Sequence, residues 1–119
     1  MKSRLTALML SSALVLSGAG MAGAQEKLDK NVKIGVLTDM SGLYSDISGA
    51  GAVLATQMAV EDSGLREKGW KIDVISADHQ LKPDVTAAIA RQWADVENVD
   101  AYVDVVASST ALALNPIAV

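Results

Sequence analysis

The chain has 119 residues and a net charge of −4 at pH 7; half of it is hydrophobic, and its only aromatic residues are Tyr44, Trp70, Trp93 and Tyr102. This composition excludes a disordered chain and favours an α/β core rich in Ala, Val and Leu. The absence of Cys excludes disulfides and Cys-based zinc or redox sites. The scattered basic residues and the few aromatics exclude a nucleic-acid-binding surface.

Residues 1–24 have the pattern of a signal peptide. A short basic segment precedes an apolar run over residues 5–16, and Ala22-Gly23-Ala24 has the small-x-small spacing that signal peptidase cleaves. The apolar run is too short to span a bilayer as a mature helix. We therefore expect cleavage after Ala24 and export of residues 25–119 to the periplasm, without stable membrane insertion of the mature chain.

The mature chain alternates between strand and helix patterns. After a polar leader we predict strands over residues 32–38, 71–77 and 101–106, a helix over about residues 52–63, and a helix from Pro83 to Asn98. Gly64 suits the C-terminal stop of the first helix, and Pro83 suits the first position of the second. Apolar residues that recur at helical spacing are expected to face the core: Val53, Met58 and Val60 in the first helix, and Val85, Ile89, Trp93 and Val96 in the second.

This order of elements predicts a three-layer α/β arrangement. Strands that alternate with helices pair in parallel through right-handed crossovers. If the helices cover opposite faces, the first strand lies between the others and the strand order is 2-1-3. Ligands bind beyond the C-terminal ends of the strands where such an order reverses. The loops that meet there are residues 39–46 and 107–110.

Residues 103–110 run from an apolar, β-branched strand directly into Ser108-Ser109-Thr110. Hydroxyl side chains can close the N-terminus of a helix, or they can hold an anion such as a carboxylate together with backbone N–H groups. Both interpretations remain open from the residues alone. Pro116 cannot lie inside a regular helix, so the following helix either begins late, with Asn115 as its cap, or is kinked.

The remaining polar candidates do not form a catalytic or metal site. His79 is the only His, and without a nucleophile partner we interpret it as a hydrogen-bonding surface residue. Asp39 and Asp46 lack further ligands for a metal ion. Gly49-Ala50-Gly51 lacks the third Gly of a phosphate-binding loop. We therefore expect no enzymatic activity, cofactor or metal. Tyr44 could either stack on a ligand or cover its loop.

Three blocks of the sequence, together with the signal peptide, resemble a known family. They are "VKIGVLTDMSGLYSDISGAG…ATQMAVEDSG", "ISADHQLKPDVTAAIARQWAD" and "VDVVASSTALALN". In combination they resemble the periplasmic solute-binding proteins of ABC transporters, type I, of the branched-chain amino acid (leucine/isoleucine/valine-binding) class. This resemblance implies two α/β lobes that close on a ligand. Residues 25–119 then correspond to the N-terminal part of lobe one, truncated after its third strand.

The resemblance also implies site residues. Ser108, Ser109 and Thr110 match the hydroxyl run that holds the ligand's carboxylate, which in the family often begins one residue earlier, at the position of Ala107. Residues 40–48, with Tyr44 and Ser48, match the segment that lines the other side of the pocket. Asp78 and His79 match a loop near the hinge side of lobe one.

The implied function is non-enzymatic binding of a small carboxylate-bearing solute, an amino acid or aromatic acid, for delivery to the permease subunits of an ABC importer. The alternative is an exported ligand-sensing domain of a receptor with the same fold. A secreted nucleotide-dependent oxidoreductase is a more distant third interpretation. As a partial lobe with exposed strand edges, residues 25–119 alone are expected to be marginally stable and to bind ligand poorly.

Overall fold

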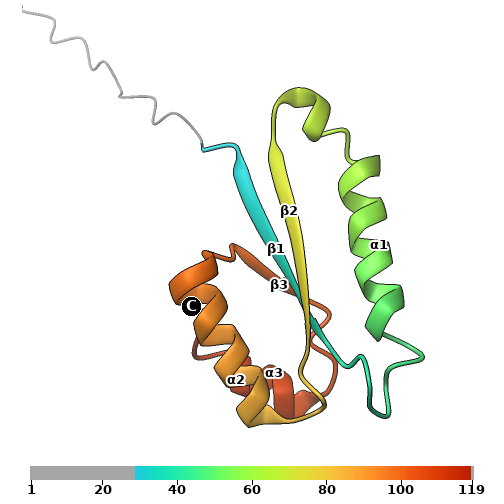
Figure 1. The fold of residues 1–119 in the computed structure, drawn as a ribbon, viewed down its shortest axis with the longest axis vertical. Coiled ribbons are helices and arrows are strands. Elements are labelled where there is room, and N and C mark those ends of the chain that lie inside the picture. Colours follow the sequence, from blue (N-terminus) through green and yellow to red (C-terminus); the bar gives the residue numbers. More distant parts are fainter. Residues whose placement is uncertain (1–28, 119) are drawn as a thin grey trace, which may run out of the picture.

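The computed structural model describes residues 29–118, so the predicted signal peptide lies outside the described residues. Figure 1 shows the elements in chain order: β1 (Asn31–Thr38), α1 (Gly49–Asp62), the 3₁₀ helix η1 (Arg66–Lys68), β2 (Lys71–Asp78), α2 (Pro83–Gln92), the π-helical turn η2 (Trp93–Glu97), β3 (Ala101–Val103) and α3 (Ser108–Leu114). Within this part of the chain, none of the helices is long and apolar enough to cross a membrane.

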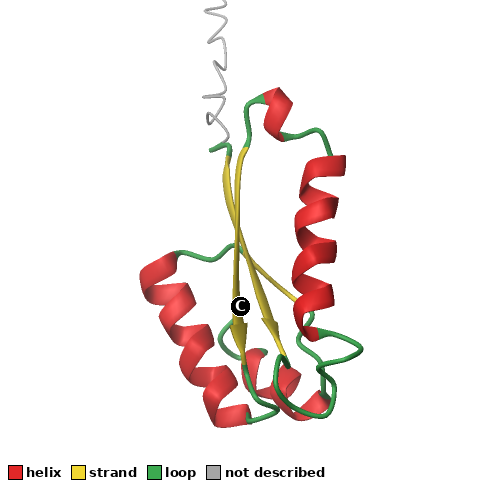
Figure 2. Ribbon diagram, turned by 45° about the vertical axis from the view of Figure 1, so that its right-hand side comes forward, coloured by secondary structure: helices red, strands yellow, loops and turns green. Residues whose placement is uncertain are grey.

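The three strands form a parallel sheet in the order β2-β1-β3, as predicted. β1 pairs with β2 along its whole length, from Asn31 opposite Lys71 to Thr38 opposite Asp78. The pairing with β3 is short, from Ile34 opposite Ala101 to Val36 opposite Val103. α1 lies on one side of the sheet and α2 with α3 on the other, which makes three layers (Figures 1 and 2).

The core lies between the sheet and the α2–α3 side. Its buried members are Leu37, Ala90, Trp93 and Leu114. The Trp93 ring stacks on Tyr102 with ring centroids 6.0 Å apart, so Trp93 is the core residue that its helical spacing predicts. Gly35 makes this possible, because a Cβ there would lie 2.4 Å from Cζ3 of Trp93.

Both long helices differ in detail from the predictions. α1 begins at Gly49, three residues before the predicted start, and Met58 is 54% exposed instead of facing the core. Val96 is also exposed, because the wider π-helical turn after Gln92 breaks the regular helical spacing. Gly64 and Asn98 have left-handed backbones and end their helical segments as predicted.

The third strand is shorter than predicted: it ends at Val103 instead of Val106. The next residue, Asp104, has a φ of 55°, which ends the extended conformation despite the β-branched residues that follow. The helix near Pro116 was also predicted wrongly, since it neither begins late nor is kinked. α3 begins at Ser108 and ends at Leu114, so Pro116 lies beyond it.

Candidate ligand-binding site

The C-terminal ends of β1 and β3 are joined through Thr38. This side chain is fully buried, and its Oγ1 donates a hydrogen bond to Oδ2 of Asp104 at 2.6 Å. The same Oγ1 accepts the backbone N–H of Gly49 at 3.2 Å. Thr38 therefore holds the start of α1 and the end of β3 against the last residue of β1.

The loop after β1 is organised around the carboxylate of Asp39, which is fully buried. Its two oxygens accept the backbone N–H groups of Gly42, at 2.7 Å, and Tyr44, at 2.8 Å. A Cβ on Gly42 would lie only 2.7 Å from this carboxylate. At the end of the loop, Oγ of Ser48 is buried and donates to the carbonyl of Tyr44 at 2.9 Å. The loop is thus held in one conformation by its own polar groups.

Asp78, the last residue of β2, connects this loop to the next one. Its carboxylate accepts the backbone N–H of Met40, at 3.1 Å, the hydroxyl of Ser41, at 2.6 Å, and the backbone N–H of Gln80, at 2.8 Å. Desolvation by burial acts to raise the pKa of Asp78, but these three hydrogen bonds and the nearby His79 outweigh it and lower the pKa below its ordinary value. Asp78 therefore stays ionised and holds the two loops together.

His79 is fully buried, so its interpretation as a surface residue is wrong. The loops that follow all three strands enclose it, which the local sequence does not reveal. Its Nδ1 accepts the backbone N–H of Leu81 at 3.1 Å. Burial lowers the pKa of His79 below its ordinary value. Smaller opposing contributions come from three nearby carboxylates, those of Asp39, Asp78 and Asp104, and from the backbone of Val106.

The three hydroxyl residues at the start of α3 differ in their exposure. Ala107 precedes the helix with a φ of 79°, and no side chain caps the helix by a hydrogen bond. Ser108 and Ser109 are exposed in the first turn, whereas Thr110 is fully buried. Oγ1 of Thr110 donates back to the carbonyls of Val106, at 2.6 Å, and Ala107, at 2.8 Å. Ser108 and Ser109 therefore present the exposed hydroxyls of this run.

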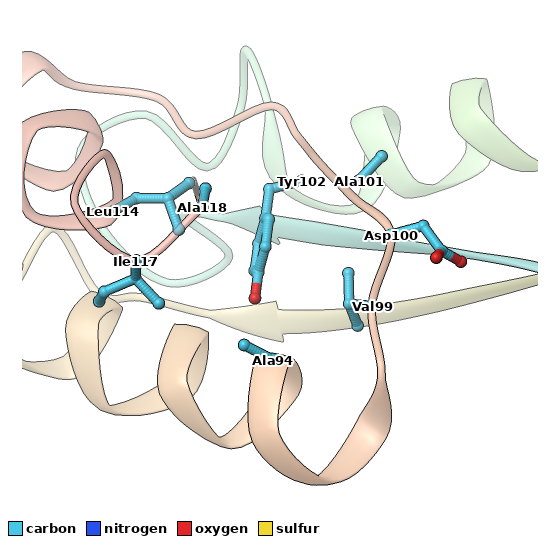
Figure 3. Close-up of a pocket in the computed structure, with 8 residues that line it drawn as sticks. All are labelled: Ala94, Val99, Asp100, Ala101, Tyr102, Leu114, Ile117 and Ala118. Atoms are coloured by element: carbon cyan, nitrogen blue, oxygen red, sulfur yellow. The ribbon is translucent and has the colours of Figure 1, made fainter.

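Of two cavities, one lies beside this edge and the other lies farther back along β3. One of about 450 Å³ lies between the loop after β1, the start of α1 and the end of β3, and its lining includes Ser48 and Asp104. The other, of about 530 Å³, lies beside β3 and the loop before it, where Figure 3 shows Leu114 and Ile117 on one side of Tyr102 and Val99 on the other. Neither cavity is lined by the predicted hydroxyl run.

The residues that organise the site are the polar ends of the strands, and of these only Asp78 was singled out from the sequence, as part of a loop near the hinge side of lobe one. Thr38, Asp78 and Asp104 each end a strand or directly follow one. In a parallel sheet such positions lie at one edge, so this shared placement is a signal that could have found them. Among residues 29–118 no cluster of His, Cys, Asp and Glu is suited to hold a metal ion.

Comparisons with known proteins agree with this architecture. A family model described as periplasmic binding protein matches residues 31–119. A periplasmic binding protein from Burkholderia mallei is 48% identical and covers 75% of this chain with a TM-score of 0.69. A branched chain amino acid ABC transporter periplasmic ligand-binding protein from Burkholderia xenovorans LB400 is 51% identical and covers 72% of this chain with a TM-score of 0.68.

A more distant match shows the fold alone. It is a solute binding protein of an ABC transporter from Rhodopseudomonas palustris BisB5 in complex with 3,4-dihydroxybenzoic acid, with 24% identity, 75% coverage of this chain and a TM-score of 0.58. No curated protein matches the sequence. This chain spans 24%, 23% and 24% of the three solved structures, about a quarter of each. The family model covers most of the chain, and the chain therefore belongs to the periplasmic binding protein family.

Proposed function

We propose that this chain forms part of the first lobe of an exported, non-enzymatic solute-binding protein that delivers a small carboxylate-bearing solute to an ABC importer. The observation that carries the proposal is the pair of exposed hydroxyls, Ser108 and Ser109, which follow the third strand of a parallel sheet, where ligands bind in folds of this kind. The predicted signal peptide, with cleavage after Ala24, agrees with function in the periplasm.

The chemistry of this turn suits a carboxylate. Hydroxyl groups and the first backbone N–H groups of a helix are donors, and these N–H groups have no acceptor within the helix. Asp104, the acidic residue between β3 and this turn, already accepts a hydrogen bond from Thr38. Because Thr110 donates to the backbone before it, we assign the direct contacts to Ser108 and Ser109. Ala107 contributes through its backbone and through the turn that its positive φ creates.

The loop after β1 supplies the opposite wall in this proposal. Ser48 is buried with its hydroxyl on the carbonyl of Tyr44, so its role is to hold the loop's shape. The side chain of Tyr44 is half-buried, which leaves an aromatic surface to lie against the ligand. We propose an amino acid or an aromatic acid as the ligand, because either combines one carboxylate with an apolar body.

Isothermal titration calorimetry of the whole protein that contains this chain tests the proposal. The probes are L-leucine, L-isoleucine and 3,4-dihydroxybenzoate, with L-leucinol as the matched probe that lacks a carboxylate. We expect saturable binding of at least one carboxylate and, if L-leucine binds, loss of binding for L-leucinol. Binding of L-leucinol as tightly as L-leucine, or binding of none of the carboxylates, would contradict the proposal.

Serine variants then test the assigned contacts. Losing a hydrogen bond to a charged group weakens affinity by about ten- to a hundredfold, so we expect Ser108→Ala or Ser109→Ala to cause a loss of that size. Ser63→Ala is the matched control, because Ser63 is also exposed but follows α1 at the opposite edge of the sheet. If both variants in the hydroxyl run bind like the control, these hydroxyls do not hold the carboxylate.

A further inference from the structure

The turn between β3 and α3 has an unusual backbone at both of its ends. Asp104 has a φ of 55° and Ala107 a φ of 79°, values that residues with a Cβ rarely adopt. Of the described residues, the other non-glycine positions with a positive φ are Gln80 and Leu81, in the loop after β2, and Asn98 at the end of η2. Strained backbone of this kind gathers at ligand-binding sites, where the surrounding structure must hold it in place.

The main chain holds only part of this turn. At its start, the N–H of Val106 donates to the carbonyl of Asp104 at 2.9 Å, a bond between residues two positions apart. At its end, the carbonyl of Ala107 accepts the N–H of Ala111 at 3.1 Å, as in a regular helix. Within the described part of the chain, no backbone N–H donates to the carbonyl of Val106. The main chain alone therefore leaves the peptide between Val106 and Ala107 without a tie to the helix.

The side chain of Thr110 supplies that tie. It is fully buried, and its hydroxyl oxygen lies 2.6 Å from the carbonyl oxygen of Val106 and 2.8 Å from that of Ala107. The hydroxyl has one proton, which the two carbonyls share, and the shorter distance favours Val106. A buried hydrogen bond is stronger than one in water. This bond joins the first turn of α3 to a residue that lies before the helix.

Ser108 and Ser109 depend on this turn for their direction. They directly follow Ala107, whose φ and ψ are 79° and 135°, and both side chains are exposed. If Ala107 returned to the negative φ that a residue with a Cβ prefers, both hydroxyls would point in a different direction relative to the sheet. The bond from Thr110 to Val106 spans Ala107 and therefore opposes that rotation.

We propose that Thr110 is a positioning residue for ligand binding: its buried hydroxyl holds Val106 and Ala107 in the strained turn and so sets where Ser108 and Ser109 meet the carboxylate. Thr110 itself does not touch the ligand. Its effect on affinity rests on the proposed function, whereas its effect on the turn can be measured without a ligand.

The first test is hydrogen–deuterium exchange, followed by mass spectrometry, on the ligand-free whole protein that contains this chain. Thr110→Val replaces the hydroxyl with a methyl group of similar size, and Thr110→Ser keeps the hydroxyl. We expect peptides that cover residues 105–112 to exchange faster in Thr110→Val and at nearly the wild-type rate in Thr110→Ser. Wild-type exchange in Thr110→Val would overturn the proposal. Fast exchange in Thr110→Ser would overturn it as well, even if Thr110→Val failed to fold.

Calorimetry of the whole protein adds the functional readout. With L-leucine, L-isoleucine or 3,4-dihydroxybenzoate, whichever the wild type binds, we expect Thr110→Val to weaken affinity about two- to tenfold, as for one lost neutral hydrogen bond. Thr110→Ser should bind like the wild type. In a protein that already carries Ser108→Ala and Ser109→Ala, Thr110→Val should weaken affinity no further, because its effect passes through these two hydroxyls. An equal loss in both backgrounds, or wild-type affinity in Thr110→Val, would overturn the proposal.

Failure of the proposed function gives a different result. A wild type that binds none of the carboxylates, or that binds them as tightly after both Ser108 and Ser109 are changed to Ala, contradicts the assigned contacts. Hydrogen exchange in residues 105–112 then decides by itself whether Thr110 holds the turn.

Discussion

The packing of Trp93 against β1 depends on Gly35 having no side chain, and Gly35→Ala should therefore be destabilising. A Cβ at this position would lie 2.4 Å from Cζ3 and 2.6 Å from Cε3 of Trp93, and 3.2 Å from Cγ1 of Val99. Carbon atoms in contact lie about 3.5–4.0 Å apart, so the indole would have to move by roughly 1 Å. It cannot do so freely, because Trp93 is only 6% exposed and packs with Leu37 and Leu114.

Overpacking a core in this way costs about 1–3 kcal/mol of unfolding free energy. For a domain of this size each kcal/mol lowers Tm by about 4–8 °C, which circular dichroism during thermal and urea unfolding measures readily. Gly51→Ala is the matched control: Gly51 lies within α1, a Cβ there meets nothing within 4 Å, and Ala should stabilise the helix by about 0.5–1 kcal/mol. Trp93→Leu should remove most of the additional cost of Gly35→Ala. If Gly35→Ala unfolds at the wild-type midpoint, the described packing of Trp93 is wrong.

Asp78→Asn should lower the unfolding free energy by about 1–3 kcal/mol in urea unfolding at pH 7, because it removes a charged acceptor from Ser41; unchanged stability would mean that these loops do not depend on the carboxylate. The folded-state pKa of His79 is below that of the unfolded chain, so the unfolded state takes up the proton first. The unfolding free energy should therefore fall as the pH drops from about 7.5 toward the folded-state pKa of His79, and His79→Gln should weaken this pH dependence. An unchanged pH dependence in the variant would refute the lowered pKa of His79. N-terminal sequencing of the exported protein should begin at Gln25, whereas a soluble product that retains Met1 would exclude the predicted cleavage.

Strand order was predictable because it depends on few choices. Right-handed crossovers place the first strand in the centre if the helices cover opposite faces of the sheet, and the pairing of β1 with both β2 and β3 confirms this order. The end of the third strand was not predictable from local propensity. Val105 and Val106 favour extended structure, but Asp104 adopts a positive φ and accepts a hydrogen bond from Thr38, 66 residues away in sequence.

The candidate site was likewise predictable from the sequence only in part. Its location beyond the strand ends followed from topology, and the hydroxyl run was visible in the sequence. The separation of that run into exposed Ser108 and Ser109 and buried Thr110 depends on the unusual backbone of Ala107, which nothing in the local sequence signals. The burial of His79 likewise arises only when the loops after all three strands come together.

The most direct test of the central claim is a crystal structure of the whole protein with a bound carboxylate ligand, L-isoleucine or 3,4-dihydroxybenzoate. We expect carboxylate oxygens about 2.7–3.0 Å from donors of Ser108 and Ser109. We also expect Oγ1 of Thr110 to remain on the carbonyl of Val106. A ligand whose carboxylate is held by other residues, with the hydroxyls of Ser108 and Ser109 facing solvent, would contradict it.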